Sequence, residues 1–243
     1  MKRYAVQVEY LGCNYSGWQR QLELETVQGK VEFAFSKVAD HPVEVQCAGR
    51  TDSGVHATRQ IIHFDSGSER DLKSWLFGVN SNLPKDIRIL WVQEVEDSFH
   101  ARFSALSRTY RYIIYPRDVS SGVLGKRVTW VRSSLDVEAM HEAAQYLLGE
   151  QDFTSFRAAN CQSSTPMRNV MRSSVFRHGK FIVFEIEGSA FLYHMVRNIV
   201  GTLFKVGLGD SEPLWVKDLL ALKDRKQASP TAPADGLYLV DVR

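Results

Sequence analysis

Apolar and polar residues alternate near the start of the chain. Over residues 4–10, Tyr4, Val6, Val8 and Tyr10 alternate with Ala5, Gln7 and Glu9. A period of two predicts a strand with one buried face. After Thr26, a favourable N-cap residue, the period becomes helical, and one face carries Val27, Val31, Ala34, Phe35 and Val38. The chain therefore begins with a predicted strand and an amphipathic helix.

Similar patterns predict the remaining elements. In the first half we expect strands over residues 43–48, 59–65 and 86–95, and a helix over 71–80 that begins after Asp71. In the second half we expect strands over 107–115, 168–178, 181–187 and 236–242, and helices over 136–149, 190–206 and 213–223. Each half then has the order strand, helix, strand, strand, helix, strand, with one helix added in the second.

This order is typical of the split βαβ, or ferredoxin-like, unit, in which helices cover one face of an antiparallel sheet. We therefore predict an α+β fold with two ferredoxin-like domains side by side and a central cleft. The domains are expected at residues 1–106 and 107–243. The length of 243 residues agrees, because single domains typically have about 100–150 residues.

Composition is that of an ordinary globular protein, with 44% apolar and 24% charged residues. We expect a cytoplasmic protein without a membrane segment, because the chain has no signal-peptide pattern and no run of about 18 apolar residues. The three cysteines are odd in number and far apart, which argues against a disulfide framework and against a zinc site. We expect no metal.

The net charge of +2 is too small to indicate a nucleic-acid partner, but the charge is unevenly distributed. Residues 108–180 contain 11 Lys and Arg against 6 Asp and Glu, whereas residues 1–107 have a net charge of −2. The local excess suits contacts with phosphates, and a solvated basic face explains it equally well.

The segment AGRTDSGVHA, residues 48–57, stands out among the candidates for chemistry. The chain has no GxGxxG or Walker-type loop, no HExxH and no GxSxG elbow, so nucleotide, zinc and serine-hydrolase functions lose their main support. Glycines and small residues in the segment would let a substrate approach Arg50 and Asp52. Local chemistry alone favours the alternative, a structural turn in which Asp52 closes an Asx-turn.

The segment resembles the signature of the tRNA pseudouridine synthase A family, which surrounds the family's catalytic aspartate. Similar blocks follow in the family's order: YLGCNYSGWQRQ at 10–21, VNSNLPKDI at 79–87, FHARFSALSRTYRYIIY at 99–115, DFTSF at 152–156, MVRNIVGTL at 195–203 and GLYL at 236–239. Two positions differ, Leu11 where the family usually has Asp and Ser53 where it usually has Ala. Neither touches a catalytic position.

The resemblance implies an isomerase that converts uridine to pseudouridine at positions 38, 39 and 40 of the tRNA anticodon stem-loop. It further implies a homodimer that needs no cofactor. Asp52 corresponds to the nucleophile and Arg197 to its basic partner, whose charge would keep a carboxylate ionised. The sequence leaves open whether the carboxylate attacks C1′, adds to uracil C6 or removes a proton from C2′.

The resemblance also assigns Tyr110 and Arg50 to the substrate. The Tyr110 ring would stack on the extracted uracil, and Arg50 would take the place of the flipped base or hold the backbone. The residues alone also allow structural roles for Tyr110 and Arg197. Tyr110 shares a predicted strand face with Tyr112, as core tyrosines do, and Arg197 lies on a helix with the apolar stripe Phe191, Met195, Ile199 and Leu203.

Other polar residues have less specific interpretations. Basic side chains that could contact phosphates are Arg108, Arg111, Lys126, Arg127, Arg168 and Arg172. We interpret His56, His63 and His194, which lie near the motifs, as hydrogen-bonded structural residues.

Two other functions fit parts of the sequence. A non-catalytic RNA-binding protein with two RRM-like sheets would need paired surface aromatics and an RNP1-like run, whereas the outstanding segment here centres on a carboxylate. A glycosidase-like hydrolase would need two carboxylates across a cleft, and we find no convincing partner for Asp52.

Overall fold

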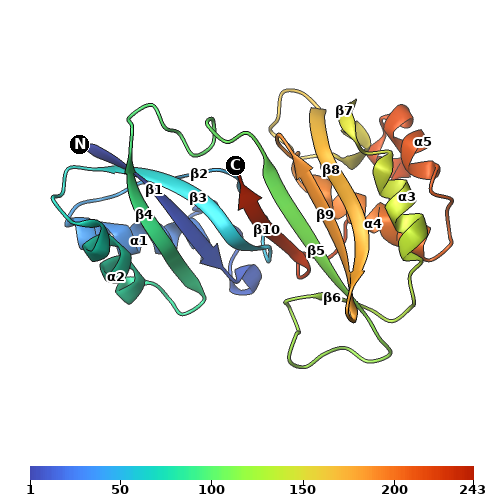
Figure 1. The fold of residues 1–243 in the computed structure, drawn as a ribbon, viewed down its shortest axis with the longest axis horizontal. Helices are drawn as coiled ribbons and strands as arrows, with labels where there is room; N and C mark the ends of the chain where they lie inside the picture. The colour runs from blue at the N-terminus through green and yellow to red at the C-terminus, as the bar shows by residue number, and fades with distance from the viewer. The chain divides into compact units, whose positions relative to one another are not determined.

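The computed structural model describes residues 1–243, which form two compact units (Figure 1). The first comprises residues 1–106 and 238–243, and the second comprises residues 107–237. The second unit therefore ends before residue 243, the end of the predicted second domain. The reason is that the last strand is tied to the first unit, where Tyr238 stacks on His56 at 4.6 Å and Asp241 pairs with Arg59 at 3.0 Å.

The first unit is built from the predicted elements. Its order is β1 (Lys2–Tyr10), a 3-10 turn (Gly12–Asn14), α1 (Val27–Ala39), β2 (Gln46–Cys47), β3 (His56–Ser66), α2 (Leu72–Asn82) and β4 (Ile87–Val95), with β10 (Leu237–Val242) from the end of the chain. β1 lies between β4 and β3 and is antiparallel to both, and β2 is antiparallel to β3. This confirms the split βαβ topology.

Local chemistry sets the helix ends in this unit. The Thr26 side chain accepts a hydrogen bond from the Gly29 amide at the start of α1, and the Asp71 carboxylate accepts one from the Ser74 amide at the start of α2. Both N-caps agree with the sequence prediction. The predicted strand at 43–48 is shorter, because only Gln46 and Cys47 pair with β3.

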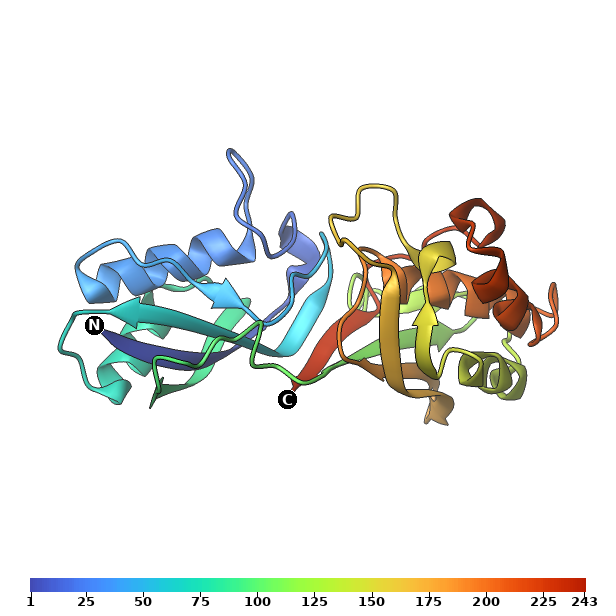
Figure 2. The same cartoon turned by 90° about the horizontal axis from the view of Figure 1, so that it is seen from above.

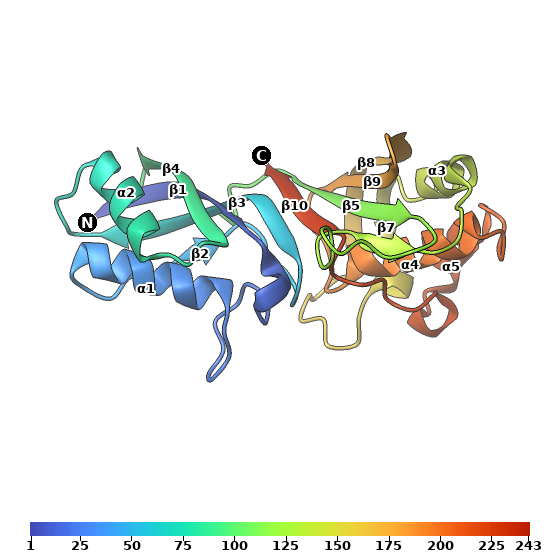
Figure 3. The same cartoon turned by 90° about the horizontal axis from the view of Figure 1, so that it is seen from below.

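One face of the first sheet forms the core against the helices (Figures 1 and 3). Tyr4 and Phe64 from the strands meet Phe35 of α1 and Trp75 of α2, with ring centroids between 4.5 and 6.0 Å apart. Because side chains alternate along a strand, the odd-numbered residues near the end of β3, such as His63, lie on the opposite face. This helix-free face becomes important below.

The second unit also combines an antiparallel sheet with helices. Its elements are β5 (Arg108–Pro116), β6 (Thr129–Val131), α3 (Val137–Gln145), β7 (Gly149–Asp152), a 3-10 turn (Thr154–Phe156), β8 (Met167–His178), β9 (Phe181–Gly188), α4 (Met195–Gly207), α5 (Trp215–Leu222) and a last 3-10 turn (Arg225–Gln227). The strand order is β5-β9-β8-β7, with β6 beside β5. The helices lie together on one side of this sheet (Figure 2).

Two predicted helices are shorter than expected. The chain leaves α3 after Gln145, and Gly149, at a φ of 91°, begins β7. α4 begins at Met195 rather than near residue 190, because His194 has a left-handed φ of 60° that cannot continue a helix. None of the helices is long and apolar enough to cross a membrane.

Candidate active site

The loop at residues 48–55 is fixed to β3 at its start. The Ala48 amide donates to the Ile61 carbonyl at 2.8 Å. The Gln60 side chain, which is 0% exposed, donates to the Gly49 carbonyl at 2.6 Å and accepts from the Gly49 amide at 3.3 Å. One buried amide side chain therefore satisfies both backbone groups of Gly49 and holds the loop along the strand.

A second segment, residues 10–18, braces the middle of the same loop. The Tyr10 hydroxyl and the Thr51 hydroxyl are 2.8 Å apart, and the Trp18 amide donates to the Thr51 carbonyl at 3.0 Å. The Gly12 amide donates to Nδ1 of the buried His56, directly after the loop, at 2.9 Å. Hydrogen bonds thus join the sequence blocks at 10–21 and 48–57.

Asp52 itself opens a tight turn within this frame. The Val55 amide donates to the Asp52 carbonyl at 3.1 Å, and Gly54 supplies the positive φ of 81° that the turn requires. The Ser53 hydroxyl donates to the Tyr15 carbonyl at 3.2 Å. Asp52 is half-buried, so its carboxylate is carried on a backbone with little freedom to move.

Close packing explains the glycines that face this loop. A Cβ added to Gly12 would lie 1.9 Å from the Val55 carbonyl oxygen, far inside any allowed contact. Gly17 has a φ of 91°, and a Cβ there would lie 2.9 Å from the Thr51 carbonyl oxygen. Only glycine lets the bracing segment approach the loop this closely.

Positive charge gathers beside the loop. Cys47 lies just before it, and burial raises the pKa of its thiol to about 12 although the nearby Arg50 and Arg102 act to lower that pKa. Arg50 is exposed, two residues before Asp52. The first unit therefore carries a half-buried carboxylate and, two residues before it, an exposed guanidinium.

Tyr110 and Arg197 belong to the second unit. Tyr110 lies on β5, is 8% exposed and meets the Phe191 ring edge-on at 5.2 Å. Tyr112 lies two residues further on β5, and its hydroxyl donates to the Pro233 carbonyl at 2.8 Å and lies 2.6 Å from the Thr129 hydroxyl. Tyr112 is therefore occupied as a core residue.

Arg197 lies in the first turn of α4. Its Nε donates to the Ala232 carbonyl at 2.9 Å, and the Ala232 amide donates to the Arg197 carbonyl at 3.1 Å. The apolar stripe of this helix is buried at Met195, Ile199 and Leu203, as predicted, while Arg197 is half-buried. Its backbone and side chain together tie α4 to the segment near residue 232.

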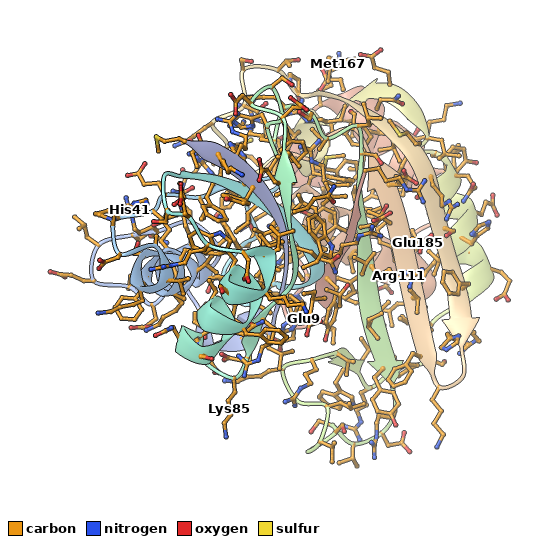
Figure 4. The ribbon with its side chains drawn as sticks, turned by 60° about the vertical axis from the view of Figure 1, so that its left-hand side comes forward. Glu9, His41, Lys85, Arg111, Met167 and Glu185 are labelled. Atoms are coloured by element: carbon orange, nitrogen blue, oxygen red, sulfur yellow. The ribbon has the colours of Figure 1, made fainter.

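The candidate phosphate contacts of the second unit include two arginines on one carboxylate. Arg111 of β5 pairs with Glu185 of β9 at 2.6 Å, and both residues are labelled in Figure 4. Arg172 of β8 pairs with the same carboxylate at 2.9 Å. The two arginines lower the pKa of Glu185 although burial acts to raise it. The three side chains carry a net charge of +1. Arg168, by contrast, donates to the carbonyl of Thr165 at 3.0 Å.

Two of the three motif histidines have identified structural roles. His56 accepts from Gly12, as described above, and Nδ1 of His63 accepts from the Ala101 amide at 3.1 Å. Burial, followed by the charges of His100 and Arg3, lowers the pKa of His63 to about 4, so it is neutral at pH 7. His194 lies at the start of α4 against the Tyr193 ring at 3.9 Å. We find no cluster of His, Cys, Asp or Glu arranged to hold a metal ion.

The topology and the braced acidic loop define an α+β protein with a candidate catalytic carboxylate on a split βαβ unit. A family model described as "tRNA pseudouridine synthase" matches residues 6–104 and 143–243. The chain belongs to the tRNA pseudouridine synthase A family, and it is an isomerase that converts uridine to pseudouridine in tRNA.

Curated relatives align with nearly the whole chain. The chain is 57% identical over 240 residues to tRNA pseudouridine synthase A of Vibrio vulnificus (strain YJ016), which covers 99% of this chain and 91% of that protein. The proteins of the same name from Vibrio cholerae (strain M66-2) and Shewanella sp. (strain MR-4) are each 55% identical to this chain over 240 residues. Both alignments include 99% of this chain, together with 91% of the Vibrio cholerae protein and 92% of the Shewanella protein.

Proposed function

We propose that this enzyme isomerises uridine to pseudouridine at positions 38, 39 and 40 of the tRNA anticodon stem-loop, with Asp52 as its nucleophile. The observation that supports this most directly is the bracing of the loop. Residues 10–18 hold both Thr51 and His56, so the backbone on each side of Asp52 is fixed. A nucleophile requires such a rigid support.

The reaction sets a definite task for the side chains. The bond between C1′ and uracil N1 breaks, and a bond between C1′ and C5 forms. The proton on C5 passes to solvent and N1 gains a proton, so the product is an isomer and no oxidant, reductant or water is consumed. The enzyme has to hold a detached uracil while the base turns, and a carboxylate can supply the nucleophile for this chemistry.

We assign Arg50 to the extraction of the target base. A uridine stacked in a stem must leave the stack before Asp52 can reach its sugar or its C6, at a cost of a few kcal/mol. Arg50 is exposed two residues from Asp52, and its guanidinium is flat and permanently charged. It can occupy the space of the flipped base or pair with a phosphate.

We assign Tyr110 to stacking on the uracil and Arg197 to the positive charge that favours an ionised carboxylate. These assignments rest on the likeness of the blocks at 99–115 and 195–203 to the family. The core contacts of Tyr112 also leave Tyr110 as the better candidate on β5.

We further propose that the enzyme acts in the cytoplasm as a homodimer. The homodimer rests on the resemblance to the family, and the cytoplasmic location on the lack of a signal-peptide pattern in the sequence. Sedimentation velocity of the full chain measures the oligomeric state, and a monomer at micromolar concentration would contradict the dimer.

Tritium release tests the proposed reaction. Transfer RNA labelled at uracil C5, with uridine at only one of positions 38, 39 and 40, should release one tritium per molecule to water. Asp52→Ala and Asp52→Asn should release none above background, because neither carries a carboxylate.

Asp40→Asn is the matched control for these variants. Asp40 is exposed at the end of α1 with a left-handed φ of 59°, which asparagine tolerates, so its activity should equal that of the parent enzyme. Release that survives in Asp52→Ala would disprove the nucleophile. Binding of a competent tRNA without any release would favour a non-catalytic RNA-binding protein.

A further inference from the structure

An exposed aromatic side chain is held on the first unit by the segment that follows β4. Phe103 is 75% exposed and lies in a turn. The His100 ring lies against it, with centroids 4.3 Å apart, and the Arg102 guanidinium lies 5.4 Å from its centroid. His100, Arg102 and Phe103 are called the aromatic platform below.

Hydrogen bonds inside the turn fix the platform. Nδ1 of His100 accepts from the Arg102 amide at 3.1 Å and lies 3.4 Å from the Phe103 amide. The His100 amide donates to the Ser104 hydroxyl at 2.9 Å, and the Ser104 amide donates to the His100 carbonyl at 2.8 Å. The backbone that carries the exposed Phe103 ring is thus held in place, although the ring is not part of the core.

The platform is anchored to the helix-free face of the sheet. The Ala101 amide donates to His63 of β3, and Arg3 of β1 donates to the Phe99 carbonyl at 2.9 Å and also to the Asp97 carbonyl. Arg3 is itself held by Asp65 of β3 through a pair of bonds at 2.7 and 2.8 Å. The two central strands therefore support the turn.

One strand, β3, supports both the platform and the catalytic loop, from its two faces. His63, which holds the platform, pairs with Gln46, and Gln60, three residues away, holds Gly49 of the loop. Three strand residues span about 10 Å. Cys47 pairs with Ile62 between these two points, and the charges of Arg50 and Arg102 both act to lower the pKa of its thiol.

We propose that the aromatic platform binds an unpaired base of the substrate RNA, from the loop next to the target uridine. Bases of single-stranded RNA stack on aromatic rings and on guanidinium planes, and a neighbouring arginine pairs with the phosphate. Phe103 supplies the ring and Arg102 the charge, on the same unit as the loop that carries Arg50 and Asp52. The proposal rests on the proposed function, and it adds a determinant of substrate position that lies outside the catalytic loop.

The side-chain chemistry distinguishes RNA from other occupants. Exposed apolar rings elsewhere on this unit, such as Phe77 on α2, lie on the helix side of the sheet. Phe103 is flanked by a cation and an imidazole on the opposite face, and such a combination complements a base and its phosphate better than an apolar protein surface.

Steady-state kinetics with tritiated tRNA test the proposal. Phe103→Ala should raise KM about 5- to 150-fold, the range for losing one base–aromatic stack, and change kcat less than about 2-fold. Phe103→Tyr should restore the parent KM, because the ring is retained. Phe77→Ala removes an equally large exposed ring from α2 and should leave both constants unchanged.

Equilibrium binding of unlabelled tRNA gives a second readout. The affinity should fall for Phe103→Ala by the same factor, and Arg102→Ala should reduce the slope of log affinity against log salt by about 0.7 to 1. This measurement still tests the platform if no tritium is released, so failure of the reaction and failure of the platform can be told apart.

Three results would overturn the inference. The first is an unchanged KM and affinity for Phe103→Ala. The second is a tRNA affinity that stays as low in Phe103→Tyr as in Phe103→Ala. The third is a change in the sedimentation of Phe103→Ala that accounts for its weaker binding. The last result would assign the ring to a contact between two copies of the chain. Thermal unfolding should be unchanged, because Phe103 is outside the core.

Discussion

Replacing Gly12 with alanine should disable the enzyme while leaving most of its fold intact. The added Cβ would lie 1.9 Å from the Val55 carbonyl oxygen, 2.6 Å from its carbon and 3.1 Å from its nitrogen. These are backbone atoms, so no side-chain rotation can relieve the collision. Contacts below 3.0 Å are essentially never seen for a real Cβ, so the two segments must separate by about 1 Å.

The separation falls on the turn that begins at Asp52. Overpacking of this kind typically costs about 1 to 3 kcal/mol of folding stability. A misplacement of about 1 Å in a catalytic group can reduce the rate about 100-fold. We therefore expect kcat/KM for tritium release to fall about 100-fold, with a modest fall in the midpoint of chemical denaturation.

Gly67→Ala is the matched control, since it makes the same change in the same unit where no atom lies within 4 Å of the new Cβ. Its kinetics and stability should equal those of the parent enzyme. If Gly12→Ala folds and retains a parental kcat/KM, then the position of the Asp52 turn does not depend on residues 10–18, and the bracing argument is refuted.

Two further predictions concern β3. Gln60→Leu leaves both backbone groups of Gly49 without their partner, which should cost about 1 to 3 kcal/mol of folding stability for each group that water cannot reach, and the denaturant midpoint measures the loss. His63 has a pKa of about 4, below the unfolded value of about 6.5, so the unfolded chain binds its proton more readily and stability should be lost as pH falls from about 6.5 to 4. His63→Gln retains an acceptor for Ala101 and should show a smaller loss between these pH values; an identical loss would assign the pH dependence to other groups.

The elements of the fold could be predicted because each has a local cause. Period-two alternation marked β1, and the side chains of Thr26 and Asp71 marked the starts of α1 and α2. The short β2 and the late start of α4 could not be predicted. The first depends on how far β3 pairs, and the second on the left-handed backbone of His194.

In the candidate site, too, some residues could be predicted from the sequence and others could not. The sequence identified Asp52 and Arg50 through the resemblance, and the fixed backbone around them agrees with that choice. It did not reveal the role of Gln60, because a buried glutamine in a strand resembles any polar residue until its partner, Gly49, is known. It also missed Phe103. The signal was present as a phenylalanine beside an arginine and a histidine, but exposure is decided by tertiary structure.

β3 explains how one strand can govern both catalysis and substrate position. His56 and Gln60 hold the braced loop, and His63 holds the platform, so three residues of one strand fix the two features. Strand residues advance by a constant rise, whereas loops can change their length and shape. We therefore expect the spacing set by β3 to change little when RNA binds. A tRNA whose loop places a base at this distance from the target uridine would be preferred over one that does not.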